Sequence, residues 1–77
     1  MNGRLPAGTP AQVERALRRA GFVLHHRRGS HRYYWHAGRR VMVTIAYHAR
    51  DLKRGTLTGI IKQAGLTIDE FTSLLRG

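Results

Sequence analysis

The sequence predicts an α+β fold of two layers, in which helices from both ends of the chain cover one face of an antiparallel sheet. Apolar residues recur at helical spacing near the start, residues 22–46 alternate with the period of strands, and helical spacing returns after residue 56. Each helical segment has a single apolar stripe, so the stripes are buried only if the helices share one face of the sheet. We expect the opposite face to remain exposed to solvent.

The first helix is predicted to begin after Thr9. Thr9 is a good N-cap, Pro10 suits the first helical position, and Gln12 is placed to complete a capping box. Gly21 then provides a C-terminal stop. The apolar stripe between these signals consists of Val13, Ala16, Leu17 and Ala20.

Residues 22–46 are predicted to form a three-stranded meander with turns at Gly29-Ser30 and residues 38–40. In the first strand, the alternation predicts that His25 and His26 point to opposite faces, with His26 on the same side as Leu24. The aromatic run at residues 33–35 should alternate in the same way. At least one of these aromatic side chains is therefore expected in the core.

A second helix is predicted to begin at Thr56 as N-cap and to end at Gly65. Gly59 lies in its interior, where glycine costs about 1 kcal/mol relative to alanine, and this predicts close packing at that position. Thr67 and Glu70 have the spacing of a second capping box, which predicts a short extra C-terminal helix over residues 68–75.

The length of 77 residues predicts a single domain, residues 1–77. No apolar run approaches the roughly 18 residues that a membrane span needs, and the first residues lack the apolar stretch of a signal peptide. We therefore expect a cytoplasmic protein without membrane contact. The chain has no cysteine, which excludes disulfides and thiolate zinc sites.

The strongest signal in the composition is charge: the chain has 14 Lys and Arg but only 4 Asp and Glu, which gives a net charge of +10. A polyanion is the expected partner, because arginine suits the geometry of phosphate and phosphate contacts release counterions. The alternative is a solvated basic surface that serves solubility. Clustering between residues 27 and 54 favours the polyanion. The basic side chains of this segment include Arg27, Arg28, Arg32, Lys53 and Arg54.

His31 is the candidate catalyst. It begins a predicted strand directly after Gly29 and Ser30, in a turn whose backbone an anion can approach closely. RNA transesterification requires a group that exchanges protons near neutral pH and cations that stabilise the phosphorane. His31 supplies the first, and Arg27, Arg28 and Arg32 are candidates for the second. From the residues alone, a phosphate-binding or packing role for His31 stays open.

Two other chemistries have less support. The five histidines suggest a metal site, but no cysteine joins them and no helical i,i+4 pair is present, so no metal ligand or cofactor is predicted. Ser30 as a nucleophile lacks a neighbouring acidic residue to orient a histidine. We interpret Ser30 as a turn former and a phosphate contact.

Two segments together, AGFVLHHRRGSHRYYWH and YHARDLKRGTLTGIIKQAGLTIDEF, resemble the HicA-type toxins, small mRNA interferases of type II toxin–antitoxin systems. The specific parts are Gly29-Ser30-His31, His48 before a basic loop, and residues 55–66. The resemblance implies an α-β-β-β-α fold like a double-stranded-RNA-binding domain and identifies His31 as the catalytic residue. Arg32 stands where family members often have a second histidine, so His36 and His48 remain open as assistants.

The resemblance also implies that the substrate is mRNA, that cleavage needs no metal, and that a HicB-type antitoxin neutralises the enzyme. The RNA-binding residues predicted around His31 are Arg27, Arg28, Gly29, Ser30, Arg32, His48, Lys53 and Arg54. The main alternative is a non-catalytic module that holds structured RNA through its basic face. A third reading is an interaction protein whose charge serves a protein partner.

Overall fold

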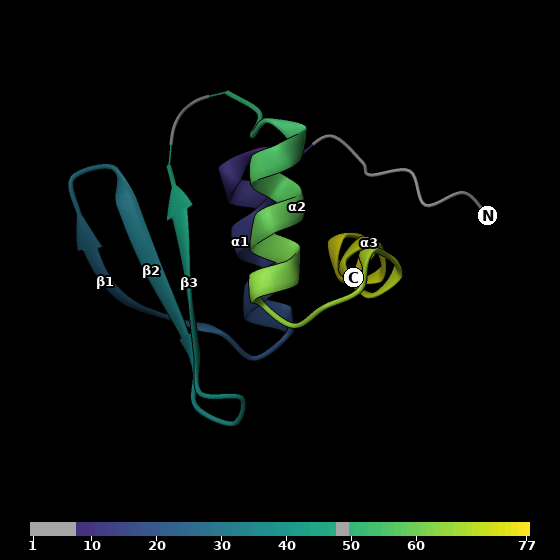
Figure 1. The fold of residues 1–77 in the computed structure, drawn as a ribbon, viewed down its shortest axis with the longest axis horizontal. Coiled ribbons are helices and arrows are strands. Elements are labelled where there is room, and N and C mark those ends of the chain that lie inside the picture. Colours follow the sequence, from purple (N-terminus) through teal and green to yellow (C-terminus); the bar gives the residue numbers. More distant parts are fainter. Residues whose placement is uncertain (1–7, 48–49) are drawn as a thin grey trace.

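The computed structural model describes residues 8–47 and 50–77. Along the chain, one helix precedes three antiparallel strands and two helices follow them, and all three helices lie on one side of the sheet, which confirms the α+β class and the predicted order (Figure 1). The elements are α1 (Pro10–Arg19), β1 (Val23–Arg28), β2 (His31–His36), β3 (Val41–Ala46), α2 (Arg54–Gln63) and α3 (Ile68–Arg76). None of the described helices is both long and apolar enough to cross a bilayer.

Local capping signals place α1 and α3 as predicted. The Thr9 hydroxyl accepts a hydrogen bond from the Gln12 amide at 3.2 Å, and the Gln12 side chain accepts one from the Thr9 amide at 2.9 Å. Thr67 and Glu70 make the same reciprocal pair at the start of α3. Both capping boxes satisfy amide groups that have no partner inside the helix.

The prediction for the start of α2 is wrong. The helix begins at Arg54, with Lys53 as an N-cap whose side chain makes no capping bond, and Thr56 lies inside the first turn. The amide of Leu52 donates to the Gly8 carbonyl at 2.8 Å, so a long-range contact fixes the chain just before this helix. The predicted close packing at Gly59 is also wrong, since a Cβ there would meet nothing within 4 Å.

The sheet has the order β1-β2-β3, with α1 and α2 on one face and α3 farther away, beside α1 (Figure 1). Tyr34, Val43 and Ile45 point from the sheet into the core and are fully buried. This burial confirms that one aromatic residue of the run at 33–35 enters the core. The opposite face, which we call the outer face, is not covered by any described element.

Candidate active site

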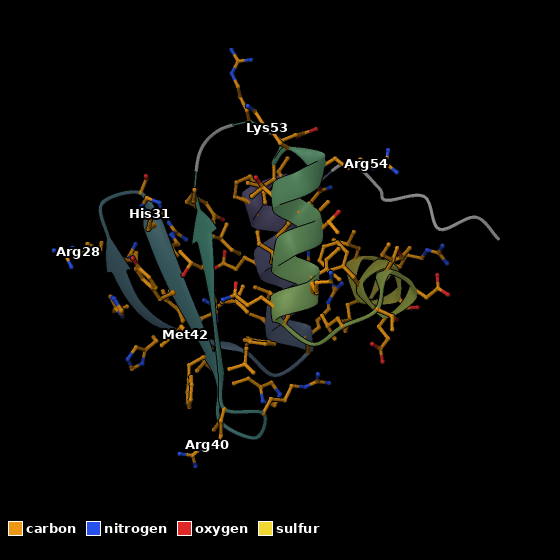
Figure 2. All side chains as sticks on the ribbon, in the orientation of Figure 1. Arg28, His31, Arg40, Met42, Lys53 and Arg54 are labelled. Carbon is orange, nitrogen blue, oxygen red and sulfur yellow. The ribbon has the colours of Figure 1, made fainter. Side chains whose placement is uncertain are left out.

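The first hairpin positions His31. Gly29 and Ser30 form a two-residue turn, and the flanking residues Arg28 and His31 pair with each other. Gly29 has φ +60° and Ser30 is not among the residues with positive φ, which is the pattern of a type II′ hairpin turn. Only the backbone angle calls for glycine, because a Cβ at this position would meet no atom within 4 Å. His31 therefore begins β2 as an exposed side chain at the end of the sheet (Figure 2).

The cross-strand register assigns His31 to the outer face. Successive side chains of a strand point to opposite faces, and Tyr34 points into the core, so His31 lies on the other side. Its cross-strand neighbours are Arg28 on β1 and Ala46 on β3. Arg28 thus shares a face with the candidate catalyst, and no hydrogen bond or ion pair of the described residues engages its guanidinium.

Arg32, by contrast, lies on the face that the helices cover. Its guanidinium stands 3.7 Å from the centre of the Tyr47 ring and 3.8 Å from a carboxylate oxygen of Glu14 on α1. The same carboxylate accepts hydrogen bonds from the hydroxyls of Tyr34 at 2.7 Å and Tyr47 at 3.1 Å. Arg18 completes this cluster, at 3.3 Å from Glu14. The structure therefore does not bring Arg32 together with His31, although the two residues are adjacent in sequence.

Glu14 is held as a carboxylate in this cluster. Desolvation by burial favours its neutral form, but the hydrogen bonds from Tyr34, Tyr47 and Arg18 outweigh this effect and lower the pKa of Glu14. Burial, together with the hydrogen bond to this carboxylate, raises the pKa of both Tyr34 and Tyr47. Both phenols therefore remain hydrogen-bond donors at neutral pH.

The end of β3 lies next to the hairpin turn, because the Tyr47 amide donates to the Ser30 carbonyl. A pocket begins there and is lined by Ala46, Arg50, Asp51, Leu52, Lys53 and Thr56. Ala46 is also the cross-strand neighbour of His31, so one residue that lines the pocket is paired with the candidate catalyst. His48, one of the predicted substrate contacts, lies outside the described residues.

The start of α2 forms another side of this pocket. Its first turn contains no acidic residue, and no side chain caps its free amides. A helix N-terminus carries partial positive charge and binds anions, and Lys53 adds a full charge to it. Arg54, however, lies on the side of α2 that faces away from the sheet (Figure 2). Lys53 and Arg54 thus lie at the same end of α2, but the Arg54 side chain is directed away from the sheet that carries His31.

His36 does not share the surroundings of His31. Its Nδ1 accepts a hydrogen bond from the Arg39 amide at 2.9 Å, and its Nε2 lies 3.1 Å from the Ala20 carbonyl. The ring also packs edge-on against Phe22. Both nitrogens are occupied by the backbone, so His36 serves the fold and not proton transfer at the opposite end of β2.

The prediction that His25 and His26 point to opposite faces of the sheet, with His26 on the side of Leu24, is wrong. A β-bulge between Leu24 and His26 inserts His25 as an extra residue, and His26 pairs with Tyr33 on the outer face instead of sharing a side with Leu24. The His26 ring stacks on Tyr33 at 4.3 Å between centroids, and His25 meets His26 edge-on at 5.3 Å. Among residues 8–47 and 50–77, no three His, Asp or Glu side chains gather as a metal site.

Several arginines that charge alone would assign to RNA have partners within the protein. Arg19 donates to the Leu74 carbonyl at 2.6 Å, at the C-terminal end of α3. Arg39, in the turn between β2 and β3, donates to the Gly65 carbonyl at 3.0 Å just after α2. Such contacts neutralise the negative ends of the two helices. The basic residues near His31 are therefore a smaller set than the composition suggests.

The fold and this site define a class: a small basic α-β-β-β-α protein with an exposed histidine at a glycine-containing hairpin turn. The family described as HicA toxin of bacterial toxin–antitoxin systems matches residues 10–66, which is more than half of the chain. The chain therefore belongs to the HicA toxin family and is, by family, the toxin of a toxin–antitoxin pair. No curated protein matches it.

Proposed function

We propose that this protein is an endoribonuclease that cleaves mRNA, with His31 as the general acid or base and without a metal ion. The observation that carries the proposal is the exposed His31 side chain at the hairpin turn, paired across the strands with Arg28. Within the described chain, no hydrogen bond occupies the His31 ring, so it is accessible to a substrate. Membership of a toxin family supplies the biological context.

The reaction is a transesterification at the sugar–phosphate backbone. The ribose 2′-hydroxyl gives up its proton and attacks the adjacent phosphorus, and the bond to the 5′-oxygen breaks as that oxygen takes up a proton. A histidine performs either transfer near neutral pH. Arg28 and the hairpin backbone at Gly29 and Ser30 stabilise the charge on the phosphorane. Lys53 and the start of α2 hold a neighbouring phosphate.

The antitoxin proposed for this toxin is of the HicB type. An acidic surface on that partner would bind the hairpin end through opposite charge, associate rapidly and exclude RNA. Because the proposed substrate, mRNA, is found in the cytoplasm, the cytoplasm is also the proposed location of the toxin. Arg27 and Arg28 are exposed and are the candidate contacts for either partner.

The test compares the wild-type protein with His31→Ala and with His25→Ala, a control that removes another exposed histidine of the same hairpin. RNA cleavage is measured in the presence of EDTA, and growth arrest is scored on expression. His31→Ala should reduce cleavage by about 10²–10⁴-fold, the usual contribution of acid–base catalysis, while His25→Ala should retain it.

Persistent cleavage by His31→Ala, with a mock purification excluding contaminating nuclease, would remove His31 from the mechanism. RNA binding without cleavage by the wild-type protein would instead favour the non-catalytic RNA-binding module. The fold supports that alternative, because it is like that of double-stranded-RNA-binding domains, which hold RNA by its shape without cutting it.

A further inference from the structure

The outer face of the sheet is ordered from a basic end to an apolar end. Its side chains stand in three rows of cross-strand neighbours: Arg28, His31 and Ala46; His26, Tyr33 and Thr44; Val23, Trp35 and Met42. The first row contains the candidate catalyst, the second a stacked pair of rings, and the third the only tryptophan. Figure 2 shows Arg28 and His31 near the hairpin end and Met42 farther along the sheet.

The third row contains one exposed apolar side chain, Val23, and two that are partly buried, Trp35 and Met42. Val23 is 56% exposed, more than any other large hydrophobic residue of the described chain, and Trp35, which lies between Val23 and Met42, keeps part of its side chain exposed. Exposed apolar surface of this kind, next to polar groups that point the same way, is typical of a binding site. The indole of Trp35 offers a large flat surface for a ligand ring.

The charges around this face indicate what the ligand is. The three strands contain no Asp or Glu, and the row beside the hairpin turn contributes a guanidinium and an imidazole. A ligand complementary to all three rows therefore has anionic groups at one end and flat rings at the other. A polynucleotide has both, and aromatic side chains bind its bases by stacking while cations follow its backbone.

We propose that the outer face binds unpaired RNA, with one base stacked on Trp35 and the sugar–phosphate backbone extending to Arg28 and His31. The inference rests on the proposed endoribonuclease function and adds to it the form of the substrate. Trp35 is four residues from His31 along one strand, or about 13 Å at the usual rise per residue. A duplex keeps its internal base faces stacked inside the helix, so an unpaired strand presents a base to Trp35 much more readily than a duplex does.

Trp35 also provides the measurement, because its fluorescence reports on the third row alone. The protein used is the full chain carrying His31→Ala, so that RNA remains intact during the titration. An unstructured single-stranded oligoribonucleotide should quench the fluorescence, and the same sequence annealed into a duplex should bind more weakly at equal salt. Equal or tighter binding of the duplex, or binding of the single strand without quenching, would overturn the proposal.

Variants test the stacking contact directly. In the His31→Ala background, Trp35→Ala should weaken single-strand binding by roughly 5–150-fold, the range for loss of one stacked base, when binding is followed by anisotropy of a labelled oligonucleotide. Trp35→Phe keeps a ring and should retain most of the affinity. Ile68→Ala truncates another partly buried apolar side chain, on α3, and serves as the matched control. Thermal unfolding of each variant confirms that it is folded before it is titrated.

A protein ligand for this face is distinguished by a polyglutamate peptide matched in charge to the oligonucleotide. Quenching by the peptide equal to that by RNA would overturn the proposal in favour of an acidic partner. The two proposals fail separately. An uncut substrate with the wild-type protein would contradict the endoribonuclease, whereas unchanged affinity of Trp35→Ala beside normal wild-type cleavage would contradict only the stacking site.

Discussion

On the face of the sheet toward the helices, three side chains of β2 each have partners elsewhere in the protein: Arg32 contacts Glu14 and Tyr47, Tyr34 donates to Glu14, and His36 bonds to the backbone at both ring nitrogens. On the outer face, no hydrogen bond of the described chain involves the side chains of His31, Tyr33 or Trp35. The alternation of one strand therefore separates residues that hold the fold from residues that are available to a ligand.

The largest expected effect comes from replacing, one at a time, the two histidines at the ends of β2. His31→Ala should reduce the cleavage rate by about 10²–10⁴-fold and change the free energy of unfolding by less than about 0.5 kcal/mol. His36→Ala should lower the free energy of unfolding by about 1–3 kcal/mol, because the Ala20 carbonyl and the Arg39 amide lose their partner. Its cleavage rate per folded molecule should be retained.

Chemical denaturation and a cleavage assay on the same preparations measure both quantities. The assignment of His36 to the fold and of His31 to catalysis is contradicted if His36→Ala loses cleavage while its stability is unchanged. It is also contradicted if His31→Ala unfolds, since an exposed side chain without partners should contribute little to the fold.

The second effect concerns the covered face. Glu14→Ala should lower the free energy of unfolding by about 2–3 kcal/mol, because the buried Tyr34 hydroxyl and the Arg32 guanidinium both lose their acceptor. Asp69→Ala removes an exposed acidic residue from the first turn of α3 and is the control, expected to cost less than about 1 kcal/mol through the lost interaction with the helix dipole. Urea denaturation of the three proteins is the measurement. Equal stability of all three would mean that the Glu14 cluster does not support the fold.

Local signals were sufficient for most of the fold. The capping boxes at Thr9 and Thr67 involve residues three positions apart, and the structure contains both. The start of α2 was missed because the bond between Leu52 and Gly8 joins distant segments. The β-bulge at His25 was missed because no glycine or proline marks it in the sequence.

The candidate site was predictable where it depends on one hairpin. Gly29, Ser30 and His31 are adjacent in sequence, and the type II′ turn keeps them together. Arg32 was grouped with His31 by charge, although strand alternation alone indicates opposite faces. Glu14 was missed because its partners Tyr34 and Tyr47 lie 20 and 33 residues away. The one available signal was an acidic residue between Val13 and Leu17, on the edge of an apolar stripe.

A smaller effect distinguishes the turn below His31 from an open helix surface. Gly29→Ala should destabilise by about 1–2 kcal/mol, because an L-residue at φ +60° is strained even in open space. Gly59→Ala makes the same chemical change in α2, where a Cβ also meets nothing, and should stabilise by about 0.5–1 kcal/mol. Thermal unfolding gives both signs. Two variants with shifts of the same sign would show that the backbone at Gly29 does not require glycine.

The smallest expected effect is a pH dependence of stability from the covered face. The folded-state pKa of Glu14 is lowered from its ordinary value of 4.5, so its contribution to stability is complete above that value and is lost as the pH falls through the folded-state pKa. The effect is small because desolvation cancels part of what the hydrogen bonds contribute. Tyr34 and Tyr47 have raised pKa values and stay protonated throughout this range.

Glu14→Gln has no such ionisation, so the stability difference between wild type and Glu14→Gln should be constant from pH 7 to about pH 5 and should shrink below about pH 4.5. Urea denaturation at a series of pH values measures this difference. A difference that grows on acidification would mean that the folded state favours the protonated carboxyl. The hydrogen bonds from the two tyrosines would then not stabilise a charge, and the covered face would depend on apolar packing alone.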